Sequence, residues 1–252
     1  MTLIELRHVS KRFGRQQVLN KVDLSIEAGK CLVIIGASGS GKSVLLKHIV
    51  RLLRPDYGEV YFRGQRIDNL PDSALVEIRC HFGFLFQGGA LFDSMNVLDN
   101  VAFPLVEHAA KTPEEIQKIA LEKLNLVNLP DVGAKMPAEL SGGQRKRVGL
   151  ARAIALDPEA ILYDEPTTGL DPIRSDVINE LIIKLQKTLK VTSIVVTHDM
   201  HSVFKIADRI VMLHLGKFIF DGTPDEIRAT NDPIVRNFVE GKATAEELKA
   251  ME

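Results

Sequence analysis

The sequence is poor in cysteine. Only two cysteines occur among its 252 residues, Cys31 and Cys80, and they lie in different apolar stretches without a C-x-x-C spacing. This scarcity excludes a disulfide framework and a cysteine metal site. It favours a reducing compartment in which both thiols are ordinary core side chains.

Neither sign of charge is in excess. The chain has 32 basic and 33 acidic residues, which gives a formal net charge of −1. A balance of this kind excludes the bulk field that would draw a protein to nucleic acid or to an anionic membrane. We therefore expect no nucleic-acid partner, and any other partner has to be recognised locally.

Long apolar runs are also missing. No uninterrupted run approaches the roughly 18 residues that a membrane span needs, and the N-terminus lacks the apolar segment of a signal peptide. Internal repeats and low-complexity segments are not visible. We expect a soluble, cytoplasmic chain, and its 45% of hydrophobic residues is enough for one large α/β domain or two small ones.

The sequence does contain a phosphate-binding pattern. Residues 36–43 match G-x-x-x-x-G-K-[ST] at every fixed position, between an apolar run of strand length at 31–35 and a helical stretch from Val44. In this order, the N–H groups of the helix N-terminus point at phosphate oxygens, Lys42 supplies charge and the Ser43 hydroxyl supplies a magnesium ligand. The alternative is a Gly-rich turn that binds nothing.

An aromatic residue precedes this pattern. Short apolar pieces between residues 3 and 27 predict antiparallel strands, interrupted by a basic, Gly-containing turn at 11–15. Phe13 lies in that turn, so its ring is placed to stack on a base whose phosphates lie at 39–43. The alternative is a packed surface aromatic.

A second Gly-rich helix start follows much later in the chain. Residues 140–144 read Leu-Ser-Gly-Gly-Gln and open a helix predicted over 145–156. Ser141 and Gln144 have the form of a capping box, which satisfies the first amides of a helix. The same amides can bind a phosphate, and the rarity of this pentapeptide favours that interpretation.

Three apolar strands end on polar residues. The strand at 82–87 ends on Gln87, the strand at 160–165 ends on Asp164 and Glu165, and the strand at 193–199 ends near His198. Ligands gather at the carboxyl edge of open α/β sheets. Two adjacent carboxylates can divide labour there, one facing magnesium and the other facing an attacking water. The alternatives are that the two carboxylates lie in a solvated turn and that His198 is a buried structural histidine.

The remaining sequence predicts the framework. Helical spacing from residue 97 to about 157 indicates a mostly helical insertion, and residues 208–221 form a hairpin. Asp171 and Pro172 form the start of a helix whose apolar residues share one face, namely Ile173, Val177, Leu181 and Leu185. We expect a single α/β domain, with a sheet core at 1–87 and 158–222, a helical subdomain at 88–157, and a C-terminal helix and mobile tail at 223–252.

Taken in order, these stretches resemble the nucleotide-binding subunit of an ABC transporter over almost the whole chain. The resemblance implies a P-loop ATPase fold with a mixed central sheet, an N-terminal antiparallel β subdomain and an inserted α-helical subdomain. It implies ATP and Mg2+ as ligands, and a head-to-tail homodimer in which the phosphate loop of one copy and the 140–144 signature of the other hold each ATP.

The resemblance also assigns roles to residues. It implies that ATP is bound by Phe13, Gly36, Ser38, Gly39, Ser40, Gly41, Lys42, Ser43, Ser141, Gly142, Gly143, Gln144 and Asp171, that magnesium is bound by Ser43, Gln87 and Asp164, and that catalysis uses Glu165, His198 and Gln87. Phe13 stands where the family usually has a stacking tyrosine, so the ring face is kept and the hydroxyl is lost.

Two further segments, 88–105 and 232–241, resemble Mla-type (Mce-associated) ATPases, which power phospholipid movement across bacterial envelopes. This implies a peripheral subunit on the cytoplasmic face of the inner membrane, a membrane permease that docks near 88–105, and accessory lipid-binding and regulatory subunits. Leu91, Phe92 and Met95 either form that docking patch or pack inside the helical insertion. The alternatives are an ATPase of an amino-acid or other polar-solute importer, a soluble ABC protein, and a scaffold that does not hydrolyse ATP.

Overall fold

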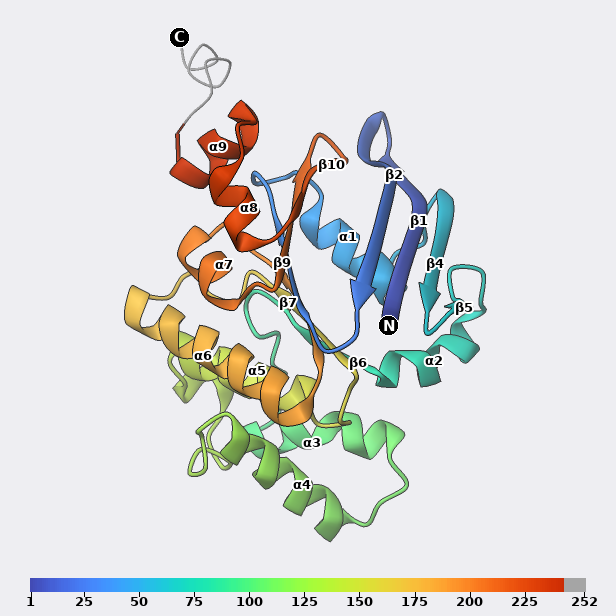
Figure 1. Ribbon diagram of the computed structural model, residues 1–252. Helices are drawn as coiled ribbons and strands as arrows, with labels where there is room; N and C mark the ends of the chain where they lie inside the picture. Colours follow the sequence, from blue (N-terminus) through green and yellow to red (C-terminus); the bar gives the residue numbers. More distant parts are fainter. Residues whose placement is uncertain (243–252) are drawn as a thin grey trace. The chain divides into compact units, whose positions relative to one another are not determined.

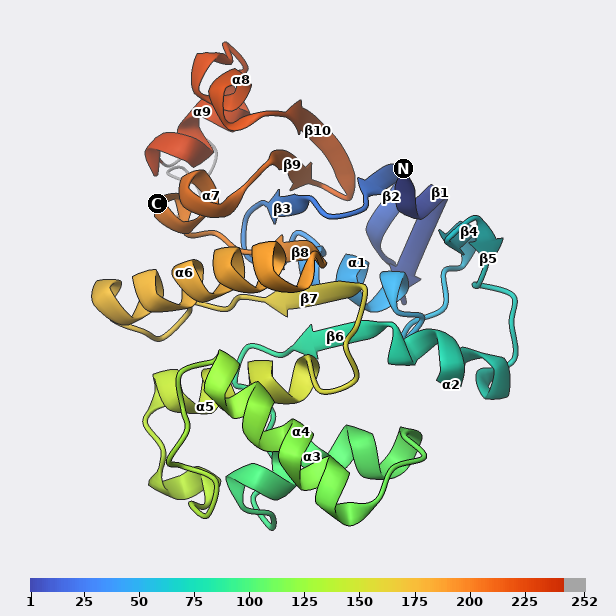
Figure 2. The ribbon, with the colours of Figure 1, turned by 60° about the horizontal axis from the view of Figure 1, so that its bottom comes forward.

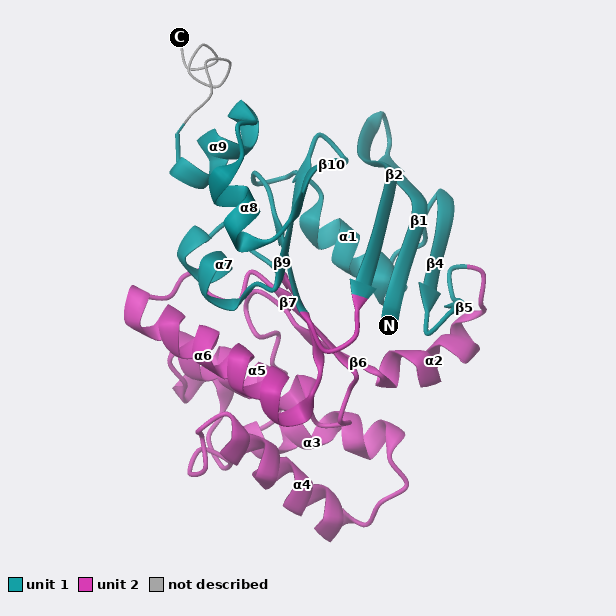
Figure 3. Cartoon of the chain, in the orientation of Figure 1, with its two compact units in different colours: residues 1–26, 31–68, 196–252 teal, residues 27–30, 69–195 magenta. Residues whose placement is uncertain are grey.

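The structure, a computed structural model, describes residues 1–242 (Figure 1). It divides into two compact units (Figure 3). Unit 1 consists of residues 1–26, 31–68 and those from Val196 onward, and unit 2 consists of 27–30 and 69–195. The mobile end predicted for the tail falls on residues 243–252, which lie outside the described part. Each unit is described by itself.

Unit 1 begins with a four-stranded sheet. Its strands are β1 (Thr2–Phe13), β2 (Gln16–Glu27), β4 (Tyr57–Phe62) and β5 (Gln65–Arg66), in the order β2-β1-β4-β5. β1 and β2 are neighbours joined by a turn at 14–15, as expected, but the turn is shorter than the predicted loop. Residues 11–13 instead complete β1, whose strand continues to Phe13.

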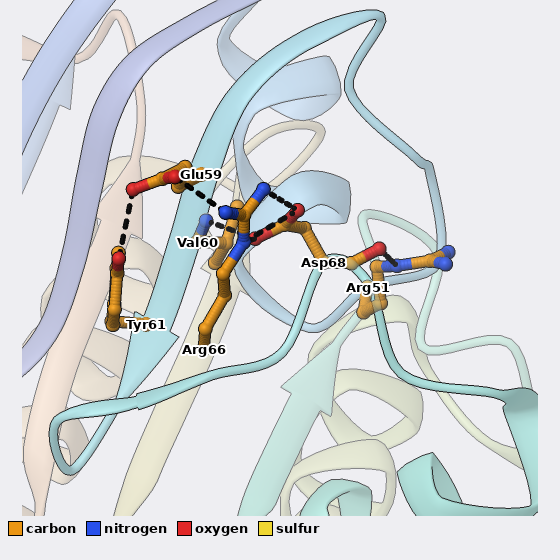
Figure 4. Close-up of polar contacts among 6 residues, drawn as sticks. All are labelled: Arg51, Glu59, Val60, Tyr61, Arg66 and Asp68. Atoms are coloured by element: carbon orange, nitrogen blue, oxygen red, sulfur yellow. Dashed lines mark hydrogen bonds and ion pairs between the residues drawn. The ribbon is translucent and has the colours of Figure 1, made fainter.

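A buried carboxylate anchors the edge of this sheet (Figure 4). Asp68 is 6% exposed, accepts a hydrogen bond from the Val60 amide at 2.8 Å and pairs with the Arg66 guanidinium at 3.0 Å. Its backbone carbonyl accepts a hydrogen bond from Nε of Arg51 at 3.0 Å. These contacts tie β4, the segment after β5 and the end of the phosphate-loop helix together.

Unit 1 also holds the strand that leads into the phosphate loop. β3 (Cys31–Ile35) is buried throughout and pairs in parallel with β9 (Arg209–His214), which forms the predicted antiparallel hairpin with β10 (Lys217–Gly222). The order within the unit is β10-β9-β3. Its helices are α1 (Lys42–Ile49), α7 (Met200–Ile206), α8 (Pro224–Ala229) and α9 (Pro233–Glu240).

Unit 2 contains the other buried strands. They are β6 (Phe82–Leu85), β7 (Ala160–Asp164) and β8 (Thr192–Val196), in the order β8-β7-β6, and β6 pairs with β7 in parallel. Two helices accompany them, α2 (Asp72–Cys80) and α6 (Pro172–Leu189). Parallel and antiparallel pairs both occur in the chain, so the α/β class predicted from the sequence is confirmed.

The rest of unit 2 is helical, as predicted. It consists of α3 (Val97–His108), α4 (Pro113–Leu126), a short 3₁₀ turn η1 (Pro137–Glu139) and α5 (Gly142–Ala153). α3, α4 and α5 pack on one another, and α5 also packs on β6 (Figure 2). Within residues 1–242, no helix has both the length and the apolar character needed to cross a membrane.

Candidate functional site

The phosphate loop in unit 1 has the backbone that its glycines predict. Gly36 and Gly41 have φ values of 151° and 102°, in the region that favours glycine. A Cβ atom on Gly36 would lie 2.3 Å from the carbonyl oxygen of Leu213, and one on Gly41 would lie 2.8 Å from a Val18 methyl. Side chains at these positions would force the loop away from β9 and β2.

The start of α1 is built to receive an anion. Its N-cap residue, Gly41, offers no side-chain hydrogen bond to the first amides of the helix. Lys42 is 7% exposed and its Nζ donates to the carbonyls of Gly36 at 2.8 Å and Ala37 at 3.0 Å, which folds the ammonium over the loop. The Oγ atom of Ser40 is buried without a hydrogen-bond partner. These features fit a bound phosphate chain.

Unit 1 also carries His198 and Phe13. The amide of Thr197 donates to the carbonyl of Ile34 at 3.3 Å, which brings the segment before His198 to the end of β3. The His198 side chain is exposed there. Phe13 is 47% exposed at the end of β1, and Nζ of Lys11 lies 5.6 Å from the centre of its ring.

The predicted carboxylates lie at the end of β7 in unit 2. Asp164 is the last residue of the strand, and Glu165 follows it with a φ of 51°, an uncommon value for a residue with a side chain. The hydroxyl of Thr168 donates to Oε2 of Glu165 at 3.0 Å. The backbone turns sharply here, and this turn aims the Glu165 side chain.

A buried lysine that the sequence analysis did not identify contacts the same loop. Lys146, in α5, is 5% exposed and donates to the backbone carbonyls of Glu165, Pro166 and Thr168. Burial lowers the pKa of Lys146 to about 8, while the Glu165 carboxylate opposes that shift. The available signal was periodicity, because Gly143, Lys146 and Leu150 share one buried helical face.

The signature region forms the predicted capping box. The Ser141 hydroxyl accepts from the Gln144 amide at 3.3 Å, and the Gln144 side chain accepts from the Ser141 amide at 2.9 Å. Because Ser141 is the N-cap, α5 begins at Gly142 rather than at Arg145 as predicted, and it ends at Ala153. Neither Gly142 nor Gly143 carries a side chain that would cover the helix N-terminus.

Asp171 caps α6, as predicted, by accepting a hydrogen bond from the Arg174 amide at 2.9 Å. The apolar face predicted for this helix is only partly buried. Ile173 and Val177 are 79% and 45% exposed, whereas Leu181 and Leu185 lie in the core. The first turns of α6, next to Asp171, therefore present apolar side chains to solvent.

Gln87 is exposed just after β6, at the start of a loop that lies against α5. A Cβ on Gly89 would lie 3.0 Å from the Arg145 carbonyl, and the Arg152 guanidinium donates to the Gly89 carbonyl at 2.9 Å. A cavity of about 330 Å³ lies beside this loop. Phe84, Phe86, Phe92, Phe103, Pro104 and Arg152 are among its lining residues.

The structure thus distributes the predicted residues over the two units. Unit 1 holds Phe13, the 36–43 loop and His198, and unit 2 holds Gln87, the 141–144 helix start, the 164–165 carboxylates and Asp171. Within unit 2, α5 begins at the signature. It contacts both the loop that holds Glu165 and the loop that follows Gln87. Among residues 1–242, no group of three or more histidine, cysteine or acidic side chains could hold a metal by itself.

Comparison with known proteins identifies the family to which the chain is similar. The ABC transporter family profile matches residues 19–168. The chain is 43% identical to the intermembrane phospholipid transport system ATP-binding protein MlaF of Haemophilus influenzae, over 96% of this chain and 91% of that protein. It is also 43% identical to the probable ribonucleotide transport ATP-binding protein mkl of Mycobacterium leprae, over 95% of this chain and 69% of that protein.

The fold has matching solved structures. A dimeric ATP-binding cassette in a post-hydrolysis state, bound to ADP and Pi, has a TM-score of 0.81 and 36% sequence identity, and the match covers 88% of this chain and 98% of that one. Identity at this level supports shared chemistry as well as a shared fold. The chain therefore belongs to the ABC transporter family and is one of its ATP-binding, ATP-hydrolysing cassettes.

Proposed function

We propose that this cassette supplies the energy for phospholipid transport between bacterial membranes. The observation that carries the proposal is the likeness to MlaF, which extends over 96% of this chain and 91% of the Haemophilus influenzae protein. The location that follows is the cytoplasmic face of the inner membrane, where the cassette would be a peripheral subunit of a permease with accessory lipid-binding and regulatory subunits.

Within the nucleotide site, each group has a chemical role. We assign the β- and γ-phosphates to Lys42 and the amides of the 36–43 loop, and the adenine ring to the exposed face of Phe13. Glu165 accepts a proton from the attacking water as the water oxygen bonds to the γ-phosphorus and the bond from that phosphorus to the oxygen of the leaving ADP breaks. His198 contacts the γ-phosphate. The uncapped start of α1 and the buried Oγ of Ser40 support the phosphate assignment.

Mg2+ belongs to this assignment as a ligand of ATP. The Ser43 hydroxyl, the Asp164 carboxylate and the Gln87 amide are oxygen donors, which suit this hard cation. Mg2+ usually keeps few protein ligands and is held largely through substrate phosphates. Bound there, it would neutralise charge that develops on the phosphate oxygens.

We also propose that two copies form one working unit. The start of α5 offers a second set of helix-terminal amides in the same chain, at residues 141–144, and a single ATP does not need two such cradles from one copy. A head-to-tail dimer uses both. The exposed Ile173 and Val177 beside Asp171 give that dimer apolar surface to bury.

The cavity next to the Gln87 loop is the proposed docking site of the permease. Its lining includes five phenylalanines, and one of them, Phe92, is 41% exposed. Arg152 is the cation in that lining, and burial lowers its pKa. A short amphipathic helix that presents apolar side chains and one carboxylate would fit this site.

The proposal is tested by purifying the protein from membranes together with its bound subunits. We expect phospholipid to copurify with a permease and a lipid-binding subunit, and ATP hydrolysis to be coupled to phospholipid transfer between vesicles. A partner set without a lipid-binding component would contradict the lipid assignment. DNA-stimulated hydrolysis without membrane association would contradict transport altogether.

A polar substrate is the second candidate. The Mycobacterium leprae relative, at the same 43% identity, has a name that refers to ribonucleotide transport. The match covers only 69% of that protein, against 91% of the Haemophilus influenzae one, which is why lipid is preferred. ATP-dependent uptake of a labelled ribonucleoside phosphate, in the absence of lipid transfer, would favour this alternative.

A further inference from the structure

The Lys146 ammonium directs all three of its hydrogen bonds to one loop, residues 165–168. Its Nζ lies 3.3 Å from the carbonyl oxygen of Glu165, 2.7 Å from that of Pro166 and 2.7 Å from that of Thr168. An ammonium group has three donors, and here it finds three acceptors. All of these are backbone atoms, so the contacts hold the path of the chain rather than a particular side chain.

The loop combines long internal hydrogen bonds with an uncommon backbone conformation. Its internal backbone hydrogen bonds are long, at 3.3 Å from the Thr168 amide to the Glu165 carbonyl and 3.2 Å from the Leu170 amide to the Thr167 carbonyl. Glu165 occupies a left-handed backbone conformation that costs free energy unless the surroundings maintain it. Lys146, in the neighbouring helix α5, holds this part of the backbone through its three hydrogen bonds.

A second buried lysine shows what a purely structural role looks like. Lys123 of α4 is 6% exposed and forms an ordinary ion pair with the carboxylate of Asp157. Lys146 instead turns its charge to three carbonyls around the residue proposed to activate water. Such an arrangement is suited to holding the backbone around Glu165 in one conformation.

We propose that Lys146 is a positioning residue for ATP hydrolysis, because it fastens the 165–168 loop to the signature helix and so sets the direction of the Glu165 carboxylate. This inference rests on the proposed role of Glu165.

The test compares Lys146→Met with Lys123→Met, which also removes a buried ammonium from unit 2 but leaves the loop untouched. We expect Lys146→Met to lower kcat about 10- to 100-fold, since small misplacements of reacting groups cost rates of this order, and to change KM for ATP by less than about twofold. Lys123→Met should keep the kcat of the wild type. Lys146→Arg, which retains donors and charge, should recover part of the loss.

Hydrogen exchange gives a readout that is independent of activity. Amides of residues 165–170 should exchange faster in Lys146→Met than in Lys123→Met, while those of 141–150 stay protected. If Lys146→Met does not fold, Lys146→Gln replaces it, because its amide can serve at most two of the three carbonyls and should give an intermediate kcat.

The outcomes separate this inference from the proposed function. A wild-type protein without ATP hydrolysis would overturn the proposed function. The positioning role alone would be overturned if the wild type is active and Glu165→Gln is inactive, but the Lys146 variant has unchanged kcat and unchanged hydrogen exchange. A parallel rise in KM would assign Lys146 to nucleotide binding and contradict the inference as well.

Discussion

At the scale of single residues, Glu165 combines an uncommon backbone conformation with the proposed role of accepting a proton from the attacking water. Its φ of 51° places the side chain where the chain leaves β7, and the Thr168 hydroxyl fixes one carboxylate oxygen at 3.0 Å. Strain of this kind persists where function requires a particular direction of the side chain.

Replacing Glu165 with glutamine should therefore separate binding from hydrolysis. The amide keeps the size and the contact with Thr168 but cannot accept a proton. Because positioned proton transfer contributes about 10²- to 10⁴-fold in rate, we expect kcat to fall by at least two orders of magnitude while the ATP dissociation constant changes little. Phosphate release and a fluorescent-nucleotide titration measure the two quantities. Hydrolysis at the wild-type rate would remove Glu165 from the mechanism.

The lowered pKa of Lys146 makes a prediction about stability. In the unfolded chain this lysine keeps its proton up to about pH 10.4, whereas in the folded protein burial lowers the pKa to about 8. Between these values the unfolded state binds more protons, so the free energy of unfolding should rise with pH, by about 1–3 kcal/mol in all.

Urea unfolding at pH 7, 8, 9 and 10 measures this effect against Lys146→Met, which cannot titrate at that position. The difference between the two proteins should be constant below pH 8 and should shift in favour of the wild type above it. A difference that stays constant up to pH 10 would contradict the lowered pKa.

The structure was predictable for residues whose conformation depends on nearby positions in the sequence. The 36–43 loop and the Ser141–Gln144 capping box depend on neighbours within a few positions, and the structure places them as expected. Lys146 was not, because its partners lie about twenty residues further along the chain and its neighbours Arg145 and Arg147 suggest a solvated helix face. Its helical spacing from Gly143 and Leu150 was the available signal, and the contact between α5 and the 165–168 loop shows that it is buried.

At the scale of elements, α5 is the helix on which unit 2 depends. It packs on β6, and the fit is tight because Gly83 of that strand has no side chain. A Cβ there would lie 2.4 Å from the carbonyl oxygen of Ala153. The strand position alone gave no indication of this requirement.

Gly83→Ala should therefore destabilise the protein by about 1–3 kcal/mol, as overpacking of a rigid backbone contact usually does. Gly88→Ala is the matched control, since a Cβ at Gly88 meets nothing within 4 Å. Its free energy of unfolding should stay within about 0.5 kcal/mol of the wild type. Thermal or urea unfolding of both variants decides the matter, and equal stabilities would show that β6 and α5 separate easily.

The element boundaries followed local chemistry more closely than the periodic pattern did. α5 starts at Gly142 because the Ser141 side chain caps it, and β1 extends to Phe13 because the turn needs only residues 14 and 15. The apolar spacing of α6 predicted a helix but not which turns would be buried. Ile173 and Val177 are exposed, and burial depends on what lies opposite each turn.

At the scale of the whole molecule, we propose that one copy does not complete the nucleotide site. The 36–43 loop is expected to bind ATP in a monomer, and hydrolysis is expected to need the 141–144 helix start of a second copy. The solved dimeric cassette bound to ADP and Pi, to which this chain is similar, supports that arrangement. The transported substrate could not be predicted from the residues of the nucleotide site.

The most direct test measures the association state of Glu165→Gln with Mg-ATP, alone and combined with Ser141→Asp or Ser141→Asn. Aspartate and asparagine cap a helix as well as serine does, so α5 should persist in both, but only aspartate places a negative charge against a phosphate. By sedimentation we expect an ATP-dependent dimer for Glu165→Gln and for its Ser141→Asn form. The Ser141→Asp form should bind ATP and remain a monomer. A dimer that forms equally with Ser141→Asp would contradict the two-copy site.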